Sequence, residues 1–283
     1  MFALPAPIRY TPWLKGQYDV APNLKPLGDK KAFEFDTLWP RIRENKERPV
    51  AGRVLRSELD DATAEATVAT LASRLVTEWP ELFAIGSDLE CRLTHERVPL
   101  TAAGLDLLAM NLPCDLAIVK QSEGRDWTAY LHVSQPSHWR PEEKIGLPFV
   151  ETHAPIPHFE KVNEVASKLV EAMISRGPWV RFVWGFETDM ELDHHPDRAP
   201  GRSFDSKPFV VRTERQVLLP LPEHSASIFL IGVGFVERET ILADESLWSP
   251  LRSALVGMSP QARKYKGVAA EFDGLLAQFP APA

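Results

Sequence analysis

The chain has 283 residues, which suits one large domain or a smaller domain with a long extension. Its 25 prolines disfavour coiled coils, solenoids and long uninterrupted helices, because an interior proline removes a hydrogen-bond donor and clashes with the preceding turn. The net charge of −7 offers no general attraction for nucleic acid or anionic lipid.

Two cysteines, Cys91 and Cys114, form no C-x-x-C pair. A disulfide framework, a zinc knuckle and an iron–sulfur site are therefore excluded. The N-terminal residues lack a basic segment followed by an apolar one, and no stretch approaches eighteen consecutive apolar residues. These features predict a soluble, cytoplasmic protein.

Residues 1–50 combine seven prolines with Trp13, Phe33, Phe35 and Trp39. So many aromatic residues argue against a disordered tail. We therefore expect an extended arm over residues 1–50 that packs against the rest of the chain.

Two helices are predicted after the arm. The first runs from about Ala62 to Trp79, where Asp60 or Asp61 can cap it and Pro80 stops it. The second runs from about Glu160 to Ser175.

Apolar or alternating runs predict five strands. In chain order they are Leu116–Val119, Trp127–Ser134, Trp179–Glu187, Phe209–Leu219 and Ser227–Val236. The strands come in runs rather than alternating with helices, which favours an α+β fold with an antiparallel sheet.

Common enzyme signatures are missing from the sequence. It contains no P-loop, G-x-S-x-G, H-E-x-x-H or EF-hand pattern, and Gly232 and Gly234 form a G-x-G inside a strand without the third glycine of a dinucleotide site. Any chemistry must therefore come from scattered residues or from a cofactor.

Two arginines lie in predicted strands. In VVRTERQVLL, alternation puts Arg215 on the face of Val211, Thr213, Val217 and Leu219, so its charge is expected to point inward. It is either a structural ion pair or a cation directed into a ligand pocket. Arg181 in WVRFVWGF is either an edge arginine that reaches water or a second inward cation.

The histidines differ in their surroundings. His194 and His195 follow several acidic residues, which predicts a solvated turn. His153 lies between an apolar stretch and a helix, and Pro155 and Pro157 fix the backbone after it. Such a histidine suits a metal or haem ligand, and it equally suits a core histidine with satisfied hydrogen bonds.

Four segments, taken in order, carry a resemblance to a known family. They are PSHWRPEEKIGLPFVETHAPIPHFEKV (136–162), VRFVWG (180–185), RTERQVLLPLPEHSASIFLI (212–231) and LVGMSPQARKYKG (255–267). They resemble elements of the haem-dependent oxidative N-demethylase alpha-subunit family, namely S-x-W, E-K-x-G, I-H-x-P-V-P, R-x-N-W, R-x-E-R-Q-T-L-x-x-L-P and a terminal M-S-P…Y-K-G. The likeness covers roughly residues 105–267. Val183 stands where the R-x-N-W pattern has Asn.

The resemblance implies a PAS-like fold, in which an antiparallel five-stranded sheet with a helical crossover cradles haem. Residues 51–283 would form this single haem-binding domain with a C-terminal helical tail, and residues 1–50 would be the arm packed on it.

The resemblance also implies haem b, with His153 as the axial ligand of the iron because it matches the histidine of the family motif; His158 is the alternative. Arg215 and Arg181 would form the polar catalytic site on the oxygen side. Further contacts with the cofactor are expected from the same segment as His153, at Lys144, Trp139 and Pro155. Lys144 would neutralise a propionate, or else it is a solvated surface lysine.

The implied activity is a monooxygenase-type, oxygen-dependent oxidation of a small secondary amine such as dimethylamine. The chain has no flavin, nicotinamide or iron–sulfur motif, so electrons are expected from a separate reductase subunit that carries flavin and an iron–sulfur centre. Two alternatives remain open: a PAS-type sensor that binds haem, gas or another ligand without turnover, and a homologue that has lost haem.

Overall fold

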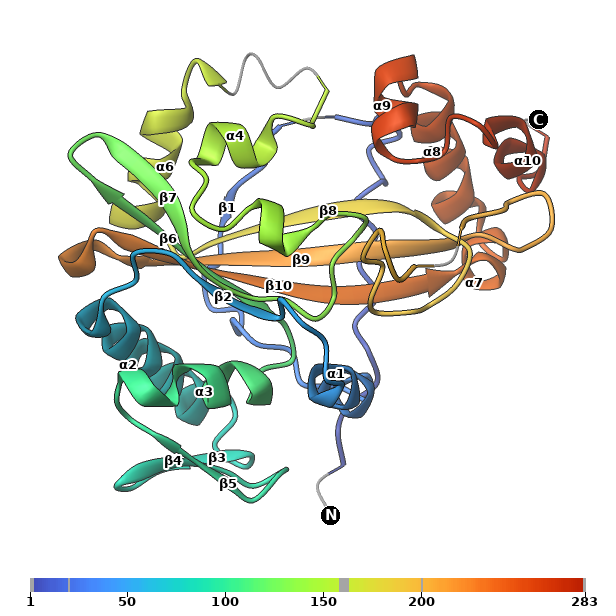
Figure 1. Cartoon of the computed structure of the whole chain (residues 1–283). Coiled ribbons are helices and arrows are strands. Elements are labelled where there is room, and N and C mark those ends of the chain that lie inside the picture. The colour runs from blue at the N-terminus through green and yellow to red at the C-terminus, as the bar shows by residue number, and fades with distance from the viewer. Residues whose placement is uncertain (1–2, 20, 158–162, 200, 282–283) are drawn as a thin grey trace.

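The computed structural model describes residues 3–19, 21–157, 163–199 and 201–281. Within these residues, seven strands form one antiparallel sheet in the order β1-β8-β9-β10-β6-β7-β2, and three more form a separate sheet in the order β3-β4-β5 (Figure 1). The strands of the large sheet are β1 (Lys25–Pro26), β2 (Val54–Arg56), β6 (Asp115–Ser122), β7 (Arg125–His132), β8 (Trp179–Glu187), β9 (Val210–Leu221) and β10 (Ala226–Glu237). Those of the small sheet are β3 (Phe83–Ile85), β4 (Asp88–Cys91) and β5 (Glu96–Pro99).

The expectation of a five-stranded PAS-like sheet is wrong, although the α+β class is correct. The five strands predicted from the sequence are the long strands β6 to β10, but β1 and β2 extend the same sheet at its two edges. These two strands have two and three residues, so they are too short to show an alternating pattern. They add to the sheet because edge strands offer unpaired backbone groups.

The helices lie on both sides of the large sheet. They are α1 (Trp39–Glu47), α2 (Asp61–Glu78), α3 (Leu105–Asn111), α4 (Phe149–His153), α6 (Ala166–Ser175), α7 (Arg238–Leu242), α8 (Glu245–Val256), α9 (Pro260–Tyr265) and α10 (Phe272–Ala277), with short 3₁₀ turns at η1 (Ala102–Gly104), η2 (Pro141–Glu143) and η3 (Pro222–His224). Helices α1, α2 and α3 lie on one side of the sheet, and α4 and α6 lie on the other (Figure 1). We call these sides the α2 face and the α6 face. Within the described ranges, no helix combines the length and apolar character needed to span a membrane.

Helix α2 shows how local chemistry sets an element. The Asp60 carboxylate accepts a hydrogen bond from the Thr63 N–H at 2.8 Å and so caps the helix, as predicted. Leu71 and Leu75 on its buried side pack into the core cluster that also contains Val217 of β9. The cluster attaches α2 to the large sheet.

The arm is packed on the body, but it is not extended throughout. Trp13, Phe33, Phe35 and Trp39 are all buried. Trp39 begins α1, and Pro40 fits the first turn of this helix, where its missing N–H would have no partner in any case. Hydrophobic burial of these rings therefore holds the arm against the sheet and against α2 and α8.

Candidate functional site

The candidate site lies on the α6 face, where β8 and β9 pair. Their register puts Arg181 opposite Gln216 and Val183 opposite Glu214. Side chains alternate along a strand, so these four residues share one face of the sheet. The position that departs from the family's R-x-N-W pattern, Val183, therefore lies directly beside Glu214.

Arg181 is the main cation of this face. Burial lowers the pKa of its guanidinium, and the Glu214 carboxylate opposes that shift. The Nε atom of Arg181 is buried and has no hydrogen-bond partner among the described residues. A buried N–H without a partner costs free energy, so this group is ready to bind a ligand's acceptor atom.

His153 lies at the end of α4, close enough to Arg181 to be influenced by its charge. Its Nδ1 contacts the Phe149 carbonyl oxygen at 2.7 Å. We assign the proton to Nδ1, since a carbonyl can only accept, and this leaves the ring lone pair on Nε2. Burial lowers the pKa of His153 to about 4, and the charges of Arg181 and Lys144 act in the same direction. The imidazole is therefore neutral at pH 7, which is the form that binds iron.

The C-terminal region adds two residues that were not predicted at the site. Lys266 donates from Nζ to the Trp184 carbonyl at 2.7 Å, and burial lowers its pKa to about 8 against the attraction of Glu214. Tyr265 is 42% exposed, and its hydroxyl lies within electrostatic reach of Glu214 and Arg181. Glu214 itself accepts a hydrogen bond from Gln216 Nε2 at 2.9 Å.

The sequence contained signals for these residues. In β9 Glu214 alternates with Arg215, which places it on the face of Arg181, and Tyr265-Lys266 belong to the terminal Y-K-G element. Neither pattern shows by itself that the two segments meet.

The other predicted cofactor contacts are spread over the segment before α6. Lys144 is half-buried, and its charge reaches His153. Trp139 packs in a small apolar cluster with Ile145 and with Phe229 of β10. Pro155 is exposed. His158 lies outside the described residues.

The structure does not bring Arg215 together with His153. Arg215 is paired with Phe182 across β8 and β9, so it lies on the α2 face, one position away from Gln216. It is buried, and it donates to the backbone carbonyls of Lys31 and Ala32 at 2.6 and 2.8 Å. Its Nε lies 3.2 Å from Glu34. Of the two interpretations of Arg215, the contacts match the structural ion pair.

His194 and His195 are 1% and 3% exposed, so the two histidines are buried rather than solvated, although Pro196, Asp197 and Arg198 after them are exposed. His194 Nε2 contacts Asp189 at 2.8 Å, and its ring stacks on His138, which contacts Glu187 at 2.9 Å. These histidines and Glu187 place three potential metal-ligand atoms within 4.8 Å. Both contacting ring nitrogens are already hydrogen-bonded to carboxylates, so the cluster is a buried network that joins this loop to β8.

Comparison with known proteins points in the same direction as the motifs. No curated protein matches the chain. A model of the family described as "haem-dependent oxidative N-demethylase, alpha subunit-like" matches residues 23–274. That match takes in the arm from residue 23 onward, the large sheet and the elements that carry His153, Arg181, Glu214 and Lys266. The chain therefore belongs to the haem-dependent oxidative N-demethylase, alpha subunit-like family.

Proposed function

We propose that this protein is a haem-carrying subunit of an oxidative N-demethylase-like enzyme, with haem b bound on the α6 face. The observation that carries the proposal is a neutral His153 within electrostatic reach of Arg181, whose buried Nε lacks a partner among the described residues. An imidazole nitrogen can serve as an axial ligand of haem iron, and cationic side chains can pair with the haem carboxylates. His153 offers the first, and Arg181, Lys144 and Lys266 offer the second.

The proposed substrate is a small secondary amine such as dimethylamine. The balanced reaction takes the amine, O₂, two electrons and two protons to the primary amine, formaldehyde and water. Haem, when bound, would supply the activation of oxygen needed to oxidise the N-methyl group.

The chain's own residues would handle charge and protons. The Glu214 carboxylate, oriented by Gln216, can form an ion pair with a secondary ammonium and so hold the substrate on this face. Lys266, with its pKa lowered to about 8, can exchange a proton near neutral pH. The Arg181 guanidinium would stabilise negative charge that develops beside it.

Electrons would come from a partner. The sequence has no flavin or nicotinamide motif, and both of its cysteines are buried, one in β4 and the other just before β6. The family description names an alpha subunit, which implies a further subunit. We propose that this partner is a reductase with flavin and an iron–sulfur centre.

The proposal is tested first by the absorption spectrum of the haem-supplied protein and then by an assay of amine demethylation. The purified protein, supplied with haem, should show a Soret band that is shifted and weakened in His153→Ala. The matched control His95→Ala, in an exposed turn, should leave the band unchanged. With a chemical reductant and O₂, dimethylamine should release formaldehyde.

Two outcomes would contradict the proposal. A protein that takes up no haem would favour a homologue that has lost the cofactor. A protein that binds haem through His153 but never releases formaldehyde from any small amine, with its reductase partner present, would favour a sensor.

A further inference from the structure

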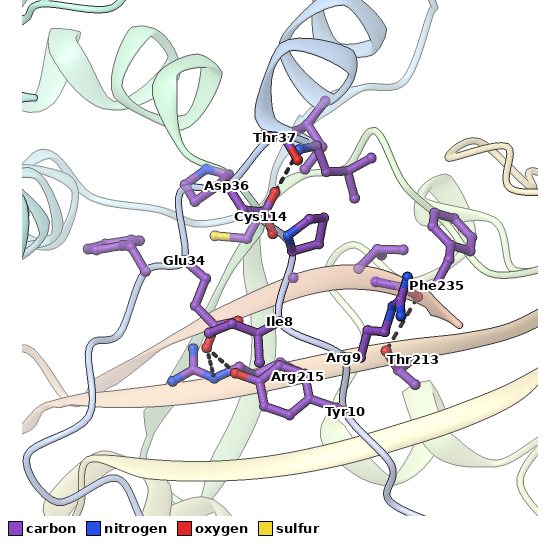
Figure 2. A pocket seen from close by; sticks show the side chains of 18 of the residues that line it. Ile8, Arg9, Tyr10, Glu34, Asp36, Thr37, Cys114, Thr213, Arg215 and Phe235 are labelled. Carbon is purple, nitrogen blue, oxygen red and sulfur yellow. Dashed lines mark hydrogen bonds and ion pairs between the residues drawn. The ribbon is translucent and has the colours of Figure 1, made fainter. Parts of the chain in front are cut away.

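A cavity of about 660 Å³ lies on the α2 face (Figure 2). Helix α4, which ends at His153, lies on the other side of the sheet (Figure 1). The walls of the cavity come from the N-terminal arm, from the residues around the start of α1 and from β9 and β10. It is therefore separate from the site proposed for haem.

Two glycines leave space in the floor of this cavity. In β10, Gly232 pairs with Arg215 and Gly234 pairs with Thr213, so both face the arm. A Cβ at Gly232 would lie 3.7 Å from the Arg215 carbonyl oxygen and 3.9 Å from the Cys114 Cβ, which are ordinary contact distances. A methyl group would fit at Gly232, and its absence leaves the hollow wider, whereas a Cβ at Gly234 would lie 3.2 Å from Thr213 Oγ1. Glycine inside a strand often marks such a close approach of another group.

Two half-buried carboxylates line the cavity, and only one of them has a cationic partner among the described residues. Tyr10 donates to Glu34, and Arg215 pairs with the same carboxylate, as Figure 2 shows. Asp36 accepts a hydrogen bond from the Leu38 N–H at 2.7 Å, but no lysine, arginine or histidine of the described chain forms an ion pair with it. Burial raises the pKa of both carboxyls, and Asp36 adds to the shift of Glu34. Arg215 is thus committed to Glu34, and Asp36 is left without a cationic partner among the described residues.

Apolar and aromatic groups surround these carboxylates. Ile42, Val217, Leu230 and Phe235 line the cavity, together with the ring of Tyr10. A carboxylate beside such walls suits a ligand with a cationic nitrogen and alkyl groups, because the nitrogen pairs with the acid and the alkyl groups displace water. Arg9 and Arg41 lie at the exposed rim, and Arg41 is already hydrogen-bonded to the Met190 carbonyl.

We propose that this cavity is a second ligand site that binds a protonated alkylamine through Asp36. The proposal does not depend on haem or on the reaction at His153. It also gives a role to Gly232 and Gly234, the G-x-G of β10, which have no role in the proposed haem site.

Isothermal titration calorimetry of the full chain tests the site. Dimethylammonium and n-butylammonium chloride are titrated in turn, with sodium acetate at the same ionic strength as the anionic probe. We expect saturable binding of at least one amine and none of acetate. Asp36→Asn should weaken the amine by at least tenfold, since a hydrogen bond to a charged group is lost while the Leu38 N–H keeps an acceptor.

Three variants distinguish binding at Asp36 from binding elsewhere on the chain. Asp29→Asn makes the same charge change at an exposed position of the arm and should bind as the wild type does. His153→Ala should also keep the titration, even if it abolishes turnover. Glu214→Gln should lose only the amine binding proposed at Glu214 and should keep the part that Asp36→Asn removes. No saturable binding of either amine, equal binding by Asp36→Asn, tighter binding of acetate, or loss of all amine binding in Glu214→Gln would each overturn the proposal.

Discussion

Arg215 shows at the residue scale how one buried charge ties distant segments together. It holds the arm through two backbone carbonyls and through Glu34. Arg215→Met leaves these acceptors without their donor, so we expect the free energy of unfolding to fall by about 3 kcal/mol. Urea unfolding measures the change. The control Arg125→Met breaks an exposed ion pair with Glu58 and should alter stability little. Equal effects of the two substitutions would contradict the anchoring role.

At the element scale, Trp13 anchors the first part of the arm to the body of the protein. Trp13 is fully buried against Trp184 and α8, and its Nε1 donates to the Leu247 carbonyl at 3.0 Å. Trp13→Ala should lower the free energy of unfolding by about 3–5 kcal/mol and speed proteolysis of the arm. Leu14→Ala, at a neighbouring residue that is 49% exposed, is the matched control. If both variants unfold at the same urea concentration, the arm is not part of the cooperative core.

The pH dependence of stability belongs to the whole molecule, because it sums contributions from separate sites. Burial lowers the pKa of His132, His153 and His194, for His153 to about 4. Between the ordinary histidine value near 6.5 and pH 4, the unfolded chain therefore binds more protons than the folded one. Stability should be fully present above about pH 6.5 and fall as the pH drops toward about 4.

Urea unfolding at pH 7.5, 6.5, 5.5 and 4.5 at constant ionic strength measures this slope. The double variant His132→Gln/His153→Gln should flatten it, whereas His95→Gln, in an exposed turn, should leave it unchanged. A wild-type curve that is level over this range would show that the buried histidines do not control acid stability.

The features that could be predicted from the sequence are those set by residues close together along the chain. The strands β6 to β10 and the cap of α2 follow from alternation and from a single side-chain hydrogen bond. The same alternation put Arg215 on the buried face with Val217, as the structure has it. It could not say which of the two covered faces would meet His153, so Arg215 was expected at a site from which the sheet separates it.

The sequence by itself determined the α+β class, the long strands and, through ordered motifs, the family and the candidate histidine. Only the tertiary structure decided the number of strands in the sheet, the burial of His194 and His195, and the placement of Lys266 within electrostatic reach of Arg181 and Glu214. The reason is physical. Periodicity reports what one segment needs to bury, whereas contacts between segments far apart in sequence depend on how all of them pack together.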